Sequence, residues 1–521
     1  MGRPVTMELV HHRLEVNAAR HPRSTALVHG EQRVSYAGLD RAANRLAHGL
    51  IARGVAPGDR VAVLLDNSVE AVVSIFGVLK AGAAFTLLSP TTKSEKLAFV
   101  VADERPAALI TINDPQRRKV ISGLPSGALP PCVVWVGGSP DLDAEGWTGW
   151  DSLDDGVEGC PPDARIDDEH IGTIIYTSGT TGEPKGVVSL HRDMVFATAS
   201  INTYLEHTDA DVLFCALPLA FTYGLYQLLT AVAAGAALVL ERNFAFPARA
   251  LRLMERERVT GFAGVPTMFS LLLRSGEIRR CDTGSLRYMT NAAAPLPEER
   301  LEQVRRAFPQ VRFYSMYGMT ECKRASYLPP EELDRRPGSV GRPIPGTDAY
   351  IVDGSGRPVG PGSEGELVLV GPHLMAGYWE RPDQTAERLR PGRVPGEVAL
   401  HTGDLFRSDA DGYLYFVSRS DDIIKTAGLK VSPLEIERSL RALPGVVDVA
   451  AVGVPDDLLG EAVKVFIVPE ADSGLTERTV LGFCRQRLEE ALIPKHVSFC
   501  AALPTSDNGK VLRRNLRSCA G

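Results

Sequence analysis

The sequence predicts a multi-domain α/β protein, with two α/β sheet subdomains, then a β-rich subdomain, and a small α+β domain at the C-terminus. Three observations lead to this prediction. Helix and strand patterns alternate before and after a loop rich in threonine and glycine at 177–186, and short strands with Gly/Pro turns follow Arg342. The last hundred or so residues again mix helices and strands. A chain of 521 residues is also too long for one core.

The first α/β part is predicted from residues 36 to 88. Tyr36–Arg53 has the periodicity of an amphipathic helix, and Arg60–Leu65 is an apolar strand. Ser68–Gly82 is a second helix that ends at glycine, and Ala84–Leu88 is a second strand. This alternation favours parallel strands joined by helices.

The same rhythm returns after the loop. A helix over Met194–Tyr204, a strand over Val212–Ala216 and a helix over Pro247–Glu257 are predicted, with Pro247 at the first helical position. The apolar stretch Leu225–Leu240 contains tyrosine, glutamine and threonine, so we expect a buried helix that runs into a strand at Ala236–Leu240, and no membrane span.

The later parts have shorter elements. Gly354–Pro358 predicts a turn, and Gly365–Val370 predicts a strand of the β-rich subdomain. The C-terminal elements are helices over Pro433–Leu443 and Glu477–Leu492, and strands over Val447–Val454 and Val463–Val468.

Composition excludes several classes of protein. The chain is 44% apolar and 23% charged, as in ordinary globular proteins, and its net charge of −7 argues against nucleic acid or anionic membrane as a partner. Its eight cysteines form no CxxC pair, so neither a zinc site nor a disulfide framework is indicated. Charged residues and histidines interrupt the N-terminal segment, which argues against a signal peptide. We therefore expect a cytoplasmic protein.

The loop at 177–186 carries the first functional signal. It follows the apolar strand Ile171–Tyr176 and contains four hydroxyl side chains, three glycines and Lys185. Glycines let backbone N–H groups approach an anion, hydroxyls donate hydrogen bonds and lysine adds a positive charge, a combination that suits a polyphosphate. The order differs from that of a P-loop, because Lys185 precedes Gly186. By composition alone, a flexible surface loop remains an alternative.

This loop resembles the signature loop of the AMP-forming acyl-activating ligases, a superfamily of acyl- and aryl-CoA synthetases, nonribosomal-peptide adenylation domains and firefly luciferase. Further segments resemble the family's later motifs in the same order: Tyr314–Glu321, Leu400–Leu405, Ser418–Pro433 and Leu503–Arg513. The resemblance covers essentially the whole chain. It implies a large adenylation core at 1–420 and a small mobile domain at 421–521, hinged at Asp421.

The resemblance implies a nucleotide site for ATP and Mg²⁺. Tyr317 packs on adenine, Thr320 contacts the α-phosphate, and Glu321 helps to hold Mg²⁺, since a carboxylate beside phosphates needs a bridging cation. Asp404 accepts from the ribose hydroxyls and Arg419 is the second ribose contact, although Ser418 stands where the family usually has glycine. The other residues assigned to nucleotide binding are Thr177, Ser178, Gly179, Thr180, Thr181, Gly182, Lys185, Ala292, Ala293, Ala294 and Gly318.

The C-terminal motifs imply two half-reactions. Lys510 on a glycine turn is the lysine that the family uses for adenylation, where it bridges the substrate carboxylate and the α-phosphate. Gly428 lets a pantetheine arm pass close to the backbone in the second conformation, and Lys425 and Lys430 either meet its phosphates or are solvated. Domain rotation about Asp421 exchanges Lys510 for the Gly428 loop. The catalytic set is Lys510, Thr320, Glu321 and Lys185.

The substrate pocket is predicted from three segments and from Met319 of the Tyr314–Glu321 motif, and its residues are Phe221, Thr222, Tyr223, Gly224, Val265, Asn291 and Met319. Amino-acid-activating relatives have aspartate at the Thr222 position to pair the substrate ammonium, and threonine cannot do so. An aryl or modest acyl acid is therefore expected, with plain core packing as the alternative role of Phe221 and Tyr223.

The acceptor stays open between three groups. CoA is the most common acceptor in the superfamily, a carrier-protein phosphopantetheine is the next, and an amine, as in amide synthetases of secondary metabolism, is the third. A nucleotide-binding regulator without catalytic activity is a further alternative. The intact Lys185, Glu321, Asp404 and Lys510 argue against it.

Overall fold

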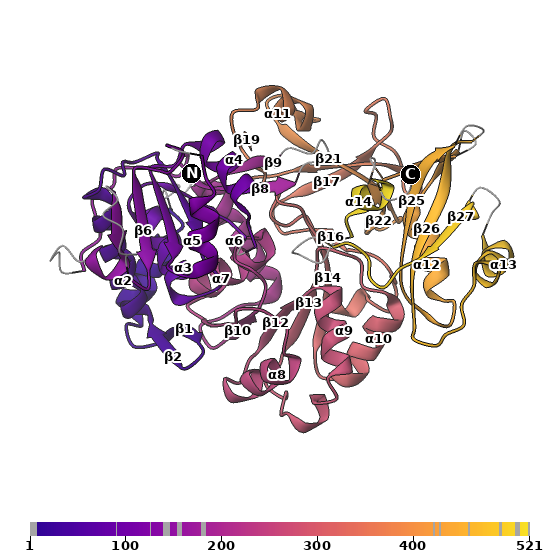
Figure 1. Cartoon of the computed structure of the whole chain (residues 1–521), viewed down its shortest axis with the longest axis horizontal. Coiled ribbons are helices and arrows are strands. Elements are labelled where there is room, and N and C mark those ends of the chain that lie inside the picture. Colours follow the sequence, from indigo (N-terminus) through magenta and orange to yellow (C-terminus); the bar gives the residue numbers. More distant parts are fainter. Residues whose placement is uncertain are drawn as a thin grey trace.

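The structure is a computed structural model of the chain. It describes residues 8–89, 91–125, 127–138, 146–153, 159–178, 184–419, 422–426, 429–456, 459–488, 492–505 and 511–518. The described residues form four β-sheets with helices packed against them, and Figure 1 shows the chain running from the indigo N-terminal part to the yellow C-terminal sheet.

Sheet one has nine strands in the order β16-β15-β14-β13-β12-β10-β11-β1-β2. Its central strands are parallel, and β2, β15 and β16 add antiparallel edges. The strands are β1 (Thr25–His29), β2 (Gln32–Ser35), β10 (Val212–Cys215), β11 (Ala237–Leu240), β12 (Gly261–Gly264), β13 (Tyr288–Asn291), β14 (Arg312–Tyr317), β15 (Ser326–Leu328) and β16 (Arg342–Pro343).

Sheet two has eight strands in the order β19-β9-β8-β4-β3-β5-β6-β7. It is parallel from β8 to β7, while β9 and β19 are antiparallel to their neighbours. The strands are β3 (Arg60–Leu64), β4 (Ala84–Leu87), β5 (Ala108–Ile112), β6 (Cys132–Val136), β7 (Trp147–Gly149), β8 (Ile171–Ser178), β9 (Pro184–Leu190) and β19 (Gly377–Tyr378).

Sheets three and four are smaller. Sheet three is antiparallel, with β17 (Asp348–Val352), β18 (Glu364–Val370), β20 (Leu389–Pro391), β21 (Val398–Ser408) and β22 (Leu414–Arg419). Sheet four contains β23 (Ile424–Thr426), β24 (Leu429–Val431), β25 (Val446–Asp456), β26 (Gly460–Pro469) and β27 (His496–Phe499). It lies at the right of Figure 1.

Several helices begin where the sequence supplies a cap or a proline. Ser35 and Ser68 accept hydrogen bonds from the first turns of α2 and α3, and Pro247 and Pro266 open α8 and α9. The helices are α1 (His12–Arg20), α2 (Tyr36–Ile51), α3 (Val69–Lys80), α4 (Ser94–Glu104), α5 (Pro115–Ser122), α6 (His191–Leu205), α7 (Thr222–Ala234), α8 (Pro247–Arg256), α9 (Pro266–Arg274), α10 (Glu298–Ala307), α11 (Pro382–Arg388), α12 (Pro433–Arg441), α13 (Glu477–Arg487) and α14 (Arg513–Ser518).

One large hydrophobic core joins sheets one and two. Buried side chains of α2, α3, α6 and α7 pack in it together with strands of both sheets. A separate cluster from α4, α5 and their strands covers another face of sheet two. Buried residues on one face of sheet four pack with α12 and α13 in a cluster that begins at Ile424, and other buried residues of the sheet pack with Leu503 and Leu516.

The predicted fold class is confirmed, and most predicted elements match within a few residues. Leu225–Leu240 is a helix followed by a strand, as expected, and the β-rich region after Arg342 is sheet three. The predicted helix over Glu477–Leu492 is too long. Leu488 adopts an extended conformation after α13, and this exit from the helix precedes Leu492, which packs in the core of sheet four.

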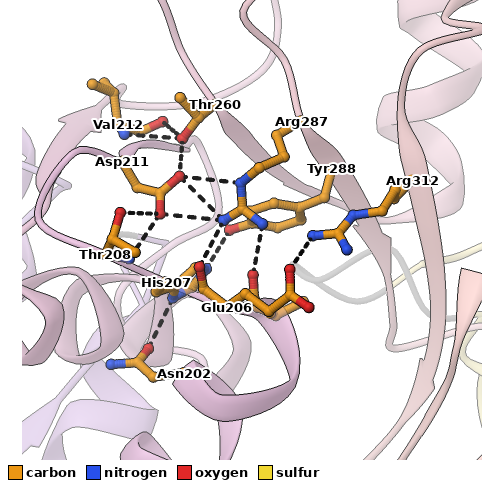
Figure 2. A network of polar contacts seen from close by, with 11 residues as sticks. Asn202, Glu206, His207, Thr208, Asp211, Val212, Thr260, Arg287, Tyr288 and Arg312 are labelled. Carbon is orange, nitrogen blue, oxygen red and sulfur yellow. Dashed lines mark hydrogen bonds and ion pairs between the residues drawn. The ribbon is translucent and has the colours of Figure 1, made fainter.

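A polar network closes the amino-terminal edge of sheet one (Figure 2). Asp211 immediately precedes β10, and its carboxylate accepts hydrogen bonds from the Thr260 hydroxyl at 2.7 Å and from Arg287 at 3.1 Å. Thr260 and Arg287 immediately precede β12 and β13. Arg312, at the start of β14, donates to Glu206 at 2.7 Å. The network therefore joins four adjacent parallel strands to the end of α6 and leaves their carboxyl ends free for a site.

His207 sits in this network as a neutral ring. Its Nδ1 is 2.8 Å from Oδ1 of Asn202, and its Nε2 is 2.7 Å from the hydroxyl of Tyr288 (Figure 2). An amide oxygen can only accept, so Nδ1 carries the proton and Nε2 accepts from Tyr288. Burial lowers the pKa of His207 to about 4, against the opposing effect of Asp211.

We predict that His207→Gln weakens the loss of stability at acid pH. Below about pH 6.5 His207 is protonated in the unfolded chain but stays neutral in the folded protein. Its contribution to the free energy of unfolding is therefore full above pH 6.5 and is lost as the pH falls towards 4. The wild type should lose roughly 1–3 kcal/mol more than the variant between pH 7 and pH 4, measured by urea unfolding. Parallel pH profiles of the two proteins would contradict this account. His11, His191 and His373, whose pKa values burial also lowers, remain in both.

Candidate active site

A cavity of about 730 Å³ lies at the carboxyl ends of β13 and β14. In open α/β sheets this edge is where ligands bind. Sheet three and the C-terminal part of the chain close the cavity. Its lining includes Thr267, Asn291, Ala293, Ala294, Met316, Tyr317, Gly318, Met319, Asp404, Phe416, Ser418, Arg419, Glu437, Val511 and Arg513.

The carboxylate of Asp404 is held from two sides. Asp404 and Arg419 are register partners on β21 and β22, and Nε of Arg419 donates to Oδ1 of Asp404 at 3.0 Å. The hydroxyl of Tyr317, at the end of β14, donates to Oδ2 at 2.6 Å. Asp404 is only 5% exposed, whereas the Arg419 side chain is about half exposed. The structure thus brings together three residues that the sequence assigned to one nucleotide.

Aromatic rings pack around Tyr317. The ring of Phe406 meets it edge-on at 4.8 Å, and the ring of Phe416 lies nearly parallel to it at 6.2 Å between centroids. Burial and the neighbouring carboxylate of Asp404 raise the pKa of Tyr317, so its hydroxyl stays a hydrogen-bond donor. Tyr317 and Phe416 both line the cavity, which gives it a flat aromatic wall suited to a planar base.

The segment after β13 bends sharply into the cavity wall. Ala293 has a φ of 72°, which is uncommon for a residue with a Cβ and is found preferentially at functional sites. Nδ2 of Asn291 donates to the carbonyl of Ala294 at 3.0 Å and holds the turn. Ala293 and Ala294 line the cavity and Ala292 is buried behind them.

The loop between β14 and β15 carries Thr320 and Glu321. Oε1 of Glu321 accepts from the hydroxyl of Tyr378 at 2.9 Å, and Nζ of Lys185 lies 5.5 Å from the centroid of the Tyr378 ring. Tyr378 therefore connects the predicted metal ligand to the predicted phosphate-binding lysine. No sequence motif indicates this role of Tyr378, because the pairing of β19 with β9 brings it next to Glu321 and Lys185.

The two described ends of the signature loop lie on neighbouring antiparallel strands. The predicted strand Ile171–Tyr176 continues as β8 to Ser178, and β9 returns antiparallel from Pro184, so Thr177 is the partner of Lys185. Lys185 therefore stands on a strand instead of on a loop, which corrects the expectation from composition. Gly179, Thr180, Thr181 and Gly182 lie outside the described residues.

The predicted acyl-pocket residues occupy neighbouring segments. Phe221 precedes α7, and Thr222, Tyr223 and Gly224 form its first turn. Gly224 packs against the backbone, since a Cβ there would lie 2.3 Å from the carbonyl oxygen of Pro218. These four residues are absent from the cavity lining above, whereas Asn291 and Met319 belong to it and Val265 immediately precedes Pro266 and Thr267 of the wall.

Three further predicted residues, Asp421, Gly428 and Lys510, lie outside the described residues. Lys430 is on β24, paired with Lys425 on β23. Val511, which follows Lys510 in the chain, pairs with Thr505 and lines the cavity.

The comparisons with known proteins identify the family. Residues 14–379 match the model of the AMP-binding enzyme family, and residues 435–510 match the model of the AMP-binding enzyme C-terminal domain. The chain belongs to the AMP-binding enzyme family. This AMP-binding enzyme is 34% identical over 502 residues to a feruloyl-CoA synthase of Amycolatopsis sp. The alignment covers 95% of this chain and 96% of the relative.

Solved structures agree with this assignment. ATP-bound MatB from Rhodopseudomonas palustris superposes with a TM-score of 0.86 at 30% identity, over 97% of this chain and 98% of that chain. The anthranilate CoA ligase AuaEII in complex with anthranoyl-AMP superposes with a TM-score of 0.88 at 27% identity, over 99% and 97% of the two chains. The predicted membership of the AMP-forming ligase superfamily is confirmed, and so is the prediction of an enzyme of the acid–thiol ligase type.

The described residues set two further bounds on the enzyme. None of the helices they form is both long and apolar enough to cross a membrane. Across the same residues, the His, Cys, Asp and Glu side chains nowhere gather in a group of three or more that could hold a metal ion.

We predict that Asp404→Asn weakens ATP binding about 10- to 100-fold, because a charge-assisted hydrogen bond to a ribose hydroxyl contributes about 1.5–3 kcal/mol. Isothermal titration calorimetry with ATP measures the effect. Asp348→Asn is the matched control, since that carboxylate pairs with Arg393 on the exposed side of β17. An unchanged Kd for the Asp404 variant would refute the assignment of this carboxylate to ATP.

Proposed function

We propose that the enzyme joins a carboxylic acid to AMP and then transfers the acyl group to the thiol of CoA. The observation that carries the proposal is the buried carboxylate of Asp404, held by Tyr317 and Arg419 in one wall of the cavity. An acceptor of this kind suits a ribose diol, and the aromatic wall beside it suits adenine. The phosphates then extend towards Lys185 and the paired ends of β8 and β9.

Magnesium fits this arrangement. Glu321 offers one carboxylate, and Mg²⁺ in nucleotide sites usually takes one or two carboxylates together with phosphate oxygens and water. The hydroxyl of Tyr378 orients that carboxylate by donating to one of its oxygens. The cation would neutralise charge on the phosphates. Thr320 precedes Glu321 in the chain, and its hydroxyl is a further hydrogen-bond donor for the phosphates.

A carboxylate is a poor electrophile, so the first half-reaction activates it by joining it to AMP. An oxygen of the acid attacks the α-phosphorus of ATP, a new O–P bond forms, and the bond to the bridging oxygen breaks so that pyrophosphate leaves with its electron pair. Lys510 is proposed to approach the cavity through its neighbour Val511 and to offset the repulsion between the carboxylate and the α-phosphate. Positioning and charge carry this step.

The second half-reaction breaks the mixed anhydride. The sulfur of CoA bonds to the acyl carbon, its proton leaves to solvent, and AMP departs. We propose that residues 421–521 rotate about Asp421 to replace Lys510 by the Gly428 and Lys430 segment. The separate core of sheet four and α12 supports this division at 420/421, because such a unit can move as a rigid body.

The acid is proposed to be aryl or a modest acyl acid, in line with the feruloyl-CoA and anthranilate enzymes among the relatives. Val265, Met319 and the start of α7 are the proposed contacts. A carrier-protein phosphopantetheine and a free amine stay as alternative acceptors. ATP and CoA are both cytoplasmic substrates, so we propose that compartment.

The test uses purified protein with MgATP and a panel of aryl and acyl acids. Pyrophosphate release that depends on an acid, followed by a CoA thioester in mass spectra, is the expected result. Acyl-AMP without thioester would move the acceptor to a carrier protein or an amine. ATP binding without pyrophosphate release from any acid would favour the inactive regulator. Lys510→Ala should abolish pyrophosphate release while a supplied acyl-AMP still reacts with CoA.

We predict that Tyr378→Phe raises the Mg²⁺ concentration needed for half-maximal pyrophosphate release about 3- to 10-fold. The variant loses one hydrogen bond to Glu321, worth about 1 kcal/mol, and the carboxylate is then less well oriented. Tyr350→Phe on β17, whose ring stacks with Arg393, is the matched control. An identical Mg²⁺ dependence in the Tyr378 variant would remove Tyr378 from the metal site.

A further inference from the structure

Two successive cations are buried behind the nucleotide loop. Lys323 is 5% exposed and Arg324 is 3% exposed. A buried charge costs several kcal/mol unless an opposite charge or strong hydrogen bonds compensate for it. The two residues differ sharply in this respect.

Lys323 is compensated within the fold. Its ammonium group donates to the carbonyl of Leu374 at 3.1 Å and lies 3.8 Å from the carboxylate of Asp193. Burial lowers the pKa of Lys323 to about 8, and Asp193 opposes that shift. Lys323 thus has an ordinary structural role, as a clamp between the loop and its neighbours.

Arg324 has only weak partners. One terminal nitrogen donates to the sulfur of Met316 at 3.3 Å, and the guanidinium carbon lies 4.9 Å from the centroid of the Tyr223 ring. Its buried Nε has no hydrogen-bond partner among the described residues. Glu321, the acid nearest to Arg324 in the chain, accepts from Tyr378, and Asp193 is paired with Lys323. Among the described carboxylates, none forms an ion pair with Arg324.

The position of Arg324 is beside the proposed acyl pocket. Met316, which it touches, lines the cavity. Gly318 of the same wall packs on it, because a Cβ there would lie 3.1 Å from the Cα of Arg324. Tyr223 anchors the other side through its hydroxyl, 2.6 Å from the Thr290 hydroxyl.

The N-terminus of α7 is a second electropositive feature on the Tyr223 side of Arg324. Tyr223 is in the first turn of α7, a 13-residue helix without a side-chain cap at its N-terminus. The hydroxyl of Thr222, in the same turn, is buried without a partner. Free N–H groups of a helix start attract negative charge, so helix and guanidinium favour the same kind of ligand.

We propose that the acid which this enzyme activates carries a second carboxylate, and that Arg324 binds it. This inference rests on the proposed function and names the substrate class. A carboxylate accepts two parallel N–H hydrogen bonds from a guanidinium. A substrate carboxylate would thus provide the negative charge that no described acid provides to Arg324. Met316 is unbranched and flexible, so its side chain can move aside to open the guanidinium to the cavity. A substrate ammonium is excluded, because it would face a like charge.

The test compares dicarboxylic acids with their own monomethyl esters. Malonate, succinate, glutarate, isophthalate and terephthalate each have an ester of the same skeleton that lacks the second charge. For the preferred skeleton, kcat/KM for pyrophosphate release by the wild type should be at least about 100-fold higher with the diacid, as expected for a buried charged hydrogen-bonded pair.

Arg324→Met should remove this preference. The diacid should lose about 100-fold in kcat/KM, mainly through KM, whereas the ester should change less than about threefold. Arg324→Lys, which keeps the charge without the paired donors, should restore part of the preference and guards against a misfolded methionine variant. Lys323→Met is the matched control. It removes a paired buried cation and should lower both activities by the same factor.

Three outcomes would overturn the inference. They are a wild type that prefers every ester, an Arg324 variant that loses both activities equally, and an unchanged diacid preference in both Arg324 variants. Thermal-shift binding of the same acids is measured without turnover. If no acid releases pyrophosphate, the proposed function fails. The inference about Arg324 still holds if a diacid raises the Tm of the wild type and not that of Arg324→Met. Equal Tm shifts in the two proteins refute it.

Discussion

The hydrogen bonds to the Asp404 carboxylate are the interaction on which the site depends. Tyr317 ends a strand of sheet one, and Asp404 and Arg419 lie on paired strands of sheet three, so these contacts fix two sheets against each other at the cavity. A buried carboxylate needs such partners, because a polar group without hydrogen bonds is costly away from water. The same partners leave it next to an aromatic wall, so the contacts that stabilise the fold also shape the site that we propose for a nucleoside.

The two edges of sheet one differ in what occupies them. The amino-terminal edge is closed by the network of Asp211, Thr260 and Arg287, which satisfies buried charges and joins adjacent strands. The carboxyl-terminal edge is left to turns such as that at Ala293, whose backbone has an uncommon conformation and faces the cavity. One edge thus stabilises the sheet, and the other carries the turns that line the candidate site.

The sequence predicts local patterns well and long-range neighbours poorly. Helix starts at Ser68 and Pro247, and the helix–strand change near Ala236, follow from capping and periodicity. The motifs around Tyr317 and Asp404 predict a common site, and the two residues meet at one cavity. The partnership of Glu321 with Tyr378 could not be predicted, since it depends on β19 joining β9 across nearly two hundred residues. The antiparallel return at Lys185 was also missed, because a glycine-rich composition favours a loop. Arg324 has no motif of its own, and only its burial and lack of an acid partner reveal it.

In the proposed reaction a carboxylate oxygen attacks the α-phosphorus of ATP in this cavity, and transfer of an oxygen isotope reports on that step. An acid labelled with ¹⁸O in its carboxylate is converted in the presence of CoA, and the products are weighed by mass spectrometry. The account predicts one ¹⁸O atom in AMP and none in pyrophosphate. Label in any other phosphate product, or unlabelled AMP formed together with the thioester, would contradict it.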